Sequence, residues 1–167
     1  MDKTNFTLTQ KCFLQVFEFK DGVLYWKTPL KFSKMKLGDK AGRLVTDGHL
    51  QTCVAGNRLY NHRIIFMMVH GYMPEQVDHI DCNPLNNQIH NLRPATNCEN
   101  LKNRRLFKSN KSGVKGVIWH KKSKKWMGYV SNNSIRKTLG MFDTIEKAEK
   151  AVKSFREQSH GEFARHS

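Results

Sequence analysis

The sequence has no long hydrophobic run. Its longest purely apolar stretch, 64–69, is six residues, whereas a membrane-spanning helix needs about 20. We therefore expect no membrane partner. The four cysteines (Cys12, Cys53, Cys82 and Cys98) form no Cys-x-x-Cys pair, which argues against a zinc ribbon. With no secretory segment at the start of the chain, we expect reduced thiols in the cytoplasm.

Acidic residues are also scarce. The chain has 14 Asp and Glu against 29 Lys and Arg, a net charge of +15. Residues 101–137 contain twelve Lys and Arg and no acidic residue. Such a segment cannot pair its charges internally, so it faces water or phosphate. This pattern favours a nucleic-acid partner, and the alternative is a generic basic protein, because charge indicates partners and not fold.

The 167 residues suffice for one ordinary domain or two small ones. In the first part, turn dipeptides between apolar runs predict hairpins and a strand-rich region: Asp21-Gly22, Asp47-Gly48 and Ala55-Gly56. The residues before these turns allow a short helix over 10–17. Residues 62–70 are predicted to form a helix that ends at Gly71.

A strand-strand-helix unit is predicted next. It comprises a strand over 76–79, a loop over 80–89, a strand over 91–93 and a helix from Asn97 to about Phe107. The helix start rests on Thr96 and Glu99, which match the capping-box pattern.

The tail has a different pattern. We expect a linker over 109–113, then strands over 114–119, 126–130 and 135–139, then a helix with one apolar face from Ile145. The fold class is therefore α+β: a strand-rich region leads into a ββα unit (core about 76–107) within a domain at 1–108. A small three-stranded antiparallel sheet packed on one helix forms a second domain at 114–167.

Four polar residues of the ββα unit indicate chemistry: Asp78, His79, Asn91 and Asn100. A helix that begins at Thr96 places Asn100 one turn in, near the hairpin where Asp78 and His79 end the first strand. A carboxylate and an amide oxygen there can bind one hard divalent cation. The adjacent neutral imidazole is a natural proton acceptor for a water nucleophile. The alternative is that these Asp and Asn residues only form ordinary turns and have no catalytic role.

The segments 77–81, 86–93 and 96–100 resemble the HNH motif of phage and intron-encoded homing endonucleases. The resemblance implies that Asp78 and Asn100 hold one Mg²⁺ or Mn²⁺ ion, and that His79 deprotonates the attacking water. The products would carry 5′-phosphate and 3′-hydroxyl ends. Asn91 would brace the loop after His79 and orient the imidazole, and Arg93 would contact a phosphate.

The motif departs from many family members, because it ends in asparagine rather than histidine. This favours magnesium or manganese over zinc, which prefers nitrogen and sulfur ligands. Of the other histidines, His62 is expected to be a packed or hydrogen-bonded core residue, with a phosphate contact as the alternative.

Residues 112–164 resemble the ethylene-response-factor-type DNA-binding domain, through 112–117, Trp119, 125–126, 139–142 and 146–148. In that fold the sheet lies in the major groove and the helix braces its back. The resemblance implies a DNA-facing set: Lys115, Trp119, His120, Lys121, Lys125 and Arg136. The alternatives are core packing for Trp119 and a solvated turn for the lysines. Ile118, Ser131 and Thr138 replace arginines and a tryptophan of plant members, so we expect phosphate contacts to dominate.

Basic residues on the predicted helix 97–107 would form a positively charged surface that leads from the metal toward this domain: Lys102, Arg104 and Arg105. Their alternative role is to complement the helix dipole.

Together these features predict a divalent-metal-dependent endonuclease that cuts or nicks double-stranded DNA. We expect a monomer or weak dimer without a protein partner, encoded by a phage and acting in the host cytoplasm. The rival hypotheses are a non-catalytic sequence-specific DNA-binding regulator and the arm-binding piece of a recombinase. RNA is a less favoured substrate, because no aromatic platform for single strands is evident.

Overall fold

The structure is a computed structural model that describes residues 9–28, 35–103, 106, 110–132, 135–160 and 163–164. The chain divides into two compact units, Met1–Ala95 and Thr96–Ser167. Both units mix short helices with small antiparallel sheets, which confirms the expected α+β class. None of the described helices combines the length and the hydropathy that crossing a bilayer would require.

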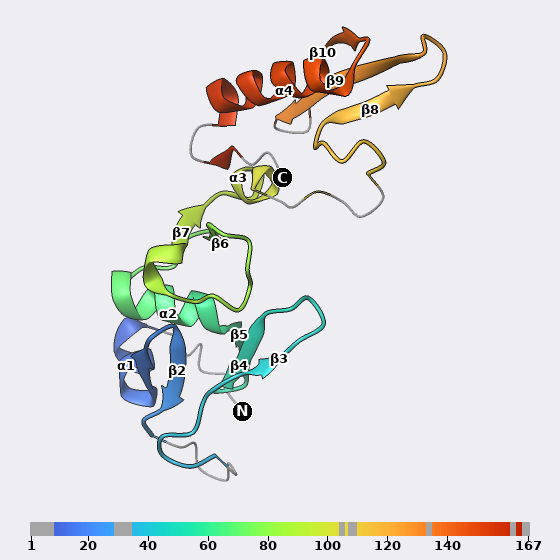
Figure 1. The fold of residues 1–167 in the computed structure, drawn as a ribbon. Coiled ribbons are helices and arrows are strands. Elements are labelled where there is room, and N and C mark those ends of the chain that lie inside the picture. The colour runs from blue at the N-terminus through green and yellow to red at the C-terminus, as the bar shows by residue number, and fades with distance from the viewer. Residues whose placement is uncertain are drawn as a thin grey trace, which may run out of the picture. The chain divides into compact units, whose positions relative to one another are not determined.

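The first unit contains three small sheets around one central helix (Figure 1). Its elements are α1 (Gln10–Val16), β1 (Phe17–Lys20), β2 (Val23–Trp26), β3 (Arg43–Leu44), β4 (Leu50–Val54), β5 (Asn57–Tyr60), α2 (Asn61–His70), β6 (Gln76–His79), the 3₁₀ turn η1 (Ile89–Asn91) and β7 (Leu92–Ala95). β1 pairs with β2, β4 pairs with both β3 and β5, and β6 pairs with β7.

Two tight turns confirm the hairpin predictions. Lys20 pairs with Val23 across the β1–β2 turn. The two residues between them, Asp21 and Gly22, have φ angles of 50° and 77°. Two positive φ angles in a two-residue loop match the twist of antiparallel strands, and Asp-Gly suits them. Ala55-Gly56 makes the equivalent turn between β4 and β5.

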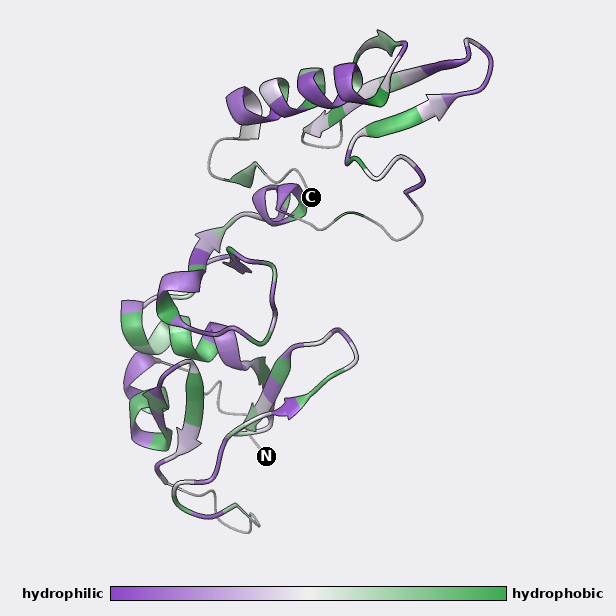
Figure 2. Ribbon diagram, in the orientation of Figure 1, coloured by the Kyte–Doolittle hydropathy of each residue, from purple (hydrophilic) through white to green (hydrophobic). Residues whose placement is uncertain are grey.

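Helix α2 supplies much of the core of the first unit. Ile64, Ile65 and Phe66 are fully buried and pack with residues of α1 and β2. Hydrophobic residues predominate along α2, whereas α4 is mostly hydrophilic (Figure 2). The helix ends as predicted at Gly71, which has a left-handed φ of 78° and donates its N–H to the Met67 carbonyl. Since α2 also contacts β4, β5 and β6, it forms the support for the β6–β7 hairpin.

The second unit places one helix on one sheet. It contains α3 (Asn97–Lys102), β8 (Val117–His120), β9 (Lys125–Asn132), β10 (Ile135–Phe142) and α4 (Ile145–His160). The antiparallel sheet has the order β10-β9-β8, and α4 packs against all three strands. The core between them contains Val117, Val130, Ala148 and Val152. This is the predicted arrangement of three strands and a helix.

Two boundaries differ from the sequence prediction. Helix α3 starts at Asn97 as expected but ends at Lys102 rather than near Phe107, which lies outside the described residues. The division between the compact units falls before α3, at residues 95 and 96, rather than in the linker predicted at 109–113. The functional boundary at 108 and 114 stays a prediction.

Candidate active site

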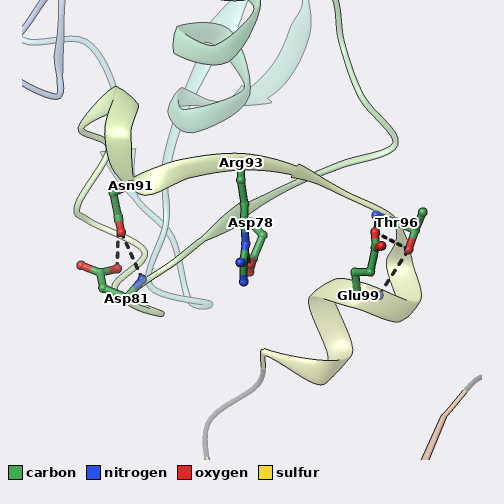
Figure 3. A network of polar contacts seen from close by, with 6 residues as sticks. All are labelled: Asp78, Asp81, Asn91, Arg93, Thr96 and Glu99. Atoms are coloured by element: carbon green, nitrogen blue, oxygen red, sulfur yellow. Dashed lines mark hydrogen bonds and ion pairs between the residues drawn. The ribbon is translucent and has the colours of Figure 1, made fainter. Parts of the chain in front are cut away.

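The β6–β7 hairpin presents Asp78 and His79 at the end of β6. Asp78 lies directly opposite Arg93 of β7 in the register. Arg93 Nε donates to Asp78 Oδ2 at 2.8 Å (Figure 3). Asp78 is only 4% exposed, and a buried carboxylate needs such a partner because desolvation of an unpaired charge is costly. Arg93 was predicted to contact a phosphate. Here it is instead paired with Asp78, the predicted metal ligand.

Asn91 ties down the loop that follows His79. Its Oδ1 accepts from the Asp81 amide at 3.1 Å, and its Nδ2 donates to Asp81 Oδ1 at 2.9 Å and to the Asn86 carbonyl at 2.8 Å. Figure 3 shows the paired contacts with Asp81. The Asn91 carbonyl also accepts from the Ile80 amide at 2.9 Å. These contacts are those expected of a loop brace, and the catalytic assignment of Asn91 stays a prediction.

The contact that orients the imidazole comes from a different residue, Asn87. His79 Nε2 lies 2.9 Å from Asn87 Oδ1, and both side chains are buried. Because an amide oxygen only accepts, Nε2 carries the proton and the lone pair belongs to Nδ1. Burial lowers the pKa of His79, and the hydrogen bond that its ring donates to Asn87 offsets part of this. The site therefore holds a neutral imidazole whose basic nitrogen is Nδ1.

Sequence reasoning did not single out Asn87, since it sits in an Asn-rich loop full of turn formers. The neighbouring asparagines do form turns. Asn83 and Asn86 accept hydrogen bonds from backbone amides two residues ahead, and Asn86 Nδ2 donates to Asp81 Oδ2 at 2.7 Å. Only Asn87, in this loop, turns its amide inward onto a ring. The only sequence feature that could have pointed to Asn87 is its spacing of eight residues from His79.

Two further histidines lie beside His79. The ring centroid of His62, near the start of α2, is 4.8 Å from that of His79. The ring of His49, just before β4, is 5.1 Å from His62 and 5.6 Å from His79. Burial is the main cause that lowers the pKa of His62 to about 2. His62 is thus buried as predicted, and it packs against His79, the predicted general base. The sequence analysis did not select His49.

Asp47 holds His49 in place. Its Oδ1 accepts from the backbone amide and from Nδ1 of His49, each at 3.0 Å, and its Oδ2 accepts from the Tyr60 hydroxyl at 2.6 Å. The Tyr60 hydrogen bond is the largest cause that lowers the pKa of Asp47 to about 2. A carboxylate on Nδ1 fixes the proton there, so the lone pair of His49 belongs to Nε2.

Asn100 is presented by α3 in the second unit. Thr96 Oγ1 accepts from the Glu99 amide at 3.3 Å, and the Thr96 amide donates to Glu99 Oε2 at 2.8 Å (Figure 3). This capping box confirms the predicted helix start. The half-buried Asn100 donates its backbone amide to the Thr96 carbonyl at 3.0 Å. Asp78 and Asn100 belong to different units, so their shared ion stays a prediction.

The residues predicted to bind DNA separate by sheet face. Cross-strand partners share a face, and neighbours along a strand alternate. Trp119 pairs with Trp126, and Val117, two residues earlier, lies in the core under α4. Trp119 therefore lies on the helix side of the sheet, 46% exposed. This differs from its predicted place on the DNA-facing side, because the register and not the residue type decides the face.

The opposite, open face carries three of the predicted residues. His120 pairs with Lys125, and Arg136 pairs with Ser131 on the same face. The Arg136 guanidinium lies 3.5 Å from the centroid of the Tyr129 ring, and Lys125 Nζ lies 3.0 Å from Asp143 Oδ1. Lys121 is exposed in the turn between β8 and β9.

The other predicted basic residues have different surroundings. Lys115 Nζ donates to the Lys102 carbonyl at 2.8 Å, so this ammonium ties the end of α3 to the segment before β8. A cation at a helix C-terminus complements the dipole. The Lys102 side chain is half-buried. Arg104 and Arg105 lie outside the described residues.

Comparison with known proteins agrees with the geometry. Residues 59–102 match the HNH endonuclease family. The chain is 37% identical over 106 residues to Protein 3.8 of Escherichia phage T7, covering 62% of this chain and 87% of that protein. It is 35% identical over 106 residues to an uncharacterized HNH endonuclease, L560, of Acanthamoeba polyphaga mimivirus, of which it spans 54%. No solved structure matches. The chain therefore belongs to the family of phage T7 Protein 3.8 and carries an HNH endonuclease domain.

Proposed function

We propose that this protein is a divalent-metal-dependent endonuclease of the homing type that hydrolyses one phosphodiester bond of duplex DNA. The observation that carries the proposal is the buried pair at the end of β6. There Asp78 is held by Arg93, and the adjacent His79 is held through Nε2 by Asn87. Both lie within the segment that matches the HNH family.

Asp78 and Asn100 would hold one Mg²⁺ or Mn²⁺ ion. Their side chains offer a carboxylate and an amide oxygen, the hard donors that these ions prefer. Arg93 donates to Oδ2 of Asp78 and so fixes the orientation of this carboxylate. When bound, the ion would stabilise the negative charge on the phosphate and on the departing 3′ oxygen as a Lewis acid.

His79 is the proposed general base. It accepts a proton from the attacking water at Nδ1, and Asn87 keeps the ring in the required tautomer and orientation. The attack leaves a 5′-phosphate and a 3′-hydroxyl. Asn91 holds the loop that contains Asn86 and Asn87 against β6, and so acts as a positioning residue.

The second unit is proposed to grip the duplex with the open face of its sheet, as in the ethylene-response-factor type. That face presents His120, Lys125 and Arg136 opposite the helix-covered side. Cationic side chains on it would contact phosphates, which gives affinity with strong salt dependence. A chain with one metal centre would nick a single strand, and cutting both strands would require two chains or two events.

The test is cleavage of supercoiled plasmid by the purified protein, with Mg²⁺ and with a chelator. Wild-type protein should convert the plasmid to open circles only with Mg²⁺. His79→Ala should abolish this while DNA affinity, measured by fluorescence anisotropy, stays within about twofold. His90→Ala removes an exposed histidine from the same loop and is the matched control, so it should cleave like wild type.

Two results would contradict the proposal. Equal cleavage by His79→Ala and wild type would remove His79 from the reaction. Tight binding without any metal-dependent conversion, under every divalent ion tried, would favour the non-catalytic regulator instead.

A further inference from the structure

The three histidines beside β6 form a compact nitrogen cluster. One ring nitrogen from each of His49, His62 and His79 can be chosen so that all three lie within 4.8 Å of one another. The ligand nitrogens of a tetrahedral zinc site are about 3.4 Å apart, given Zn–N distances of about 2.0–2.1 Å. On binding, rotation of the rings would have to bring the three nitrogens to this separation. The three side chains come from a loop, α2 and β6, so the fold alone assembles them.

The outer contacts of the cluster match those of metal-binding histidines. Such residues usually donate the second ring N–H to a carboxylate or a carbonyl, which fixes the tautomer. His49 donates Nδ1–H to Asp47 Oδ1 at 3.0 Å, and His79 donates Nε2–H to the Asn87 amide oxygen at 2.9 Å. The coordinating atoms would therefore be Nε2 of His49 and Nδ1 of His79. The His49 side chain is 28% exposed, so an ion has a path inward.

We propose that His49, His62 and His79 form a binding site for a nitrogen-preferring transition ion, of which Zn²⁺ is the representative, and that its occupancy inhibits the nuclease. Zinc prefers imidazole nitrogen, whereas Mg²⁺ prefers the oxygens of Asp78 and Asn100. Asp78 belongs to the set of oxygen ligands, and the next residue, His79, belongs to the set of nitrogen ligands. The binding site follows from the cluster alone, and its inhibitory effect rests on the proposed function of His79.

Inhibition follows from the shared nitrogen. An ion on Nδ1 of His79 uses the lone pair that would accept the proton from water, so an occupied cluster has no general base. Neutral imidazole is the form of histidine that binds a metal.

The experiment begins with isothermal titration of Zn²⁺ into metal-stripped, untagged full-length protein. We expect one zinc per chain in wild type and a Kd raised at least about tenfold in His49→Asn. His90→Asn, which removes an exposed histidine outside the cluster, should bind like wild type. Zinc held by the four cysteines would be the same in all three proteins. His62→Gln, checked for folding by circular dichroism, provides a second removal of a ligand.

Cleavage with Mg²⁺ supplies the second readout. Zinc should inhibit wild type, and His49→Asn, compared with its own cleavage rate with Mg²⁺ alone, should resist the same zinc concentration. No saturable zinc binding, or equal Kd values in wild type, His49→Asn and folded His62→Gln, would overturn the site. Equal zinc inhibition of His49→Asn would overturn the inhibitory role. If no protein cleaves with Mg²⁺, the proposed function fails while the titration still decides the site.

Discussion

Polar residues are buried at the β6–β7 hairpin but exposed on one face of the sheet in the second unit. At the hairpin, Asp78, His79, Asn87 and Asn91 are all buried, and each makes a specific hydrogen bond. On the open face of the sheet, by contrast, Arg136 and Lys125 are exposed. Chemistry at one atom needs fixed geometry, whereas attraction to a phosphate chain needs only charge nearby. Substitutions should accordingly be severe in the hairpin and mild on the sheet.

The largest effect is expected from Arg93→Ala. It leaves the Asp78 carboxylate buried without its cationic partner, and breaking such a pair costs about 3–5 kcal/mol of the free energy of unfolding. Guanidinium chloride unfolding without divalent ions measures this. Arg58→Ala, at an exposed site in the same unit, should change stability by less than about 0.5 kcal/mol. The double variant Asp78→Ala/Arg93→Ala should recover most of the loss, and failure to recover would mean that the charge is not the cause.

Asn87→Ala should come next, with a fall in kcat of about 100-fold. General-base catalysis contributes about 10²–10⁴-fold, and the variant loses the contact that sets the tautomer and direction of His79. The KM for DNA should stay unchanged, because Asn87 is buried. Asn87→Asp retains an acceptor oxygen and should restore part of kcat. Asn83→Ala, at an exposed position of the same loop, is the control. A rise in KM with an unchanged kcat would assign Asn87 to binding.

Arg136→Ala should have a smaller effect, a few-fold loss of DNA affinity that is equal for unrelated sequences. Removal of one phosphate contact lowers the slope of log K against log salt by about one. Lys150→Ala removes the same charge from an exposed position on α4, and its binding should stay close to wild type. Fluorescence anisotropy at several salt concentrations measures both. Sequence-dependent losses in Arg136→Ala would instead indicate base reading by this arginine.

The smallest change is expected for Trp119→Ala, below about twofold in DNA affinity, because Trp119 lies on the side of the sheet that α4 covers. The same anisotropy titration, run beside Arg136→Ala, shows which face of the sheet contributes more to DNA affinity. A loss of affinity larger than that of Arg136→Ala would place the DNA contact on the helix side and reverse the assignment of faces.

Local signals in the sequence predicted the elements well. The Asp21-Gly22 turn, the Thr96–Glu99 capping box and the Gly71 helix end each involve residues within a few positions of one another. Their physics is local, since turn sterics and helix caps depend on neighbouring backbone atoms. The extent of α3 was less predictable, because a basic stretch after Lys102 has good helix propensity whether or not tertiary contacts support it.

The partners within the candidate site could not be predicted in the same way. Nothing near His79 in the sequence indicates that His62 and His49, 17 and 30 positions earlier, pack against it. The phosphate contact of Arg93 was expected only from the resemblance to the HNH motif. Only the β6–β7 register places it opposite Asp78. A shift of one residue would have turned either side chain to the other face.

The sequence by itself determined the α+β class, the basic character of the tail and the residue types of the HNH segment, because composition, periodicity and close spacing carry that information. Only the tertiary structure decided which nitrogen of His79 is basic, which residue pairs with Asp78 and which face of the sheet is open. These properties depend on contacts between segments distant in the chain, and on burial, which no local pattern specifies.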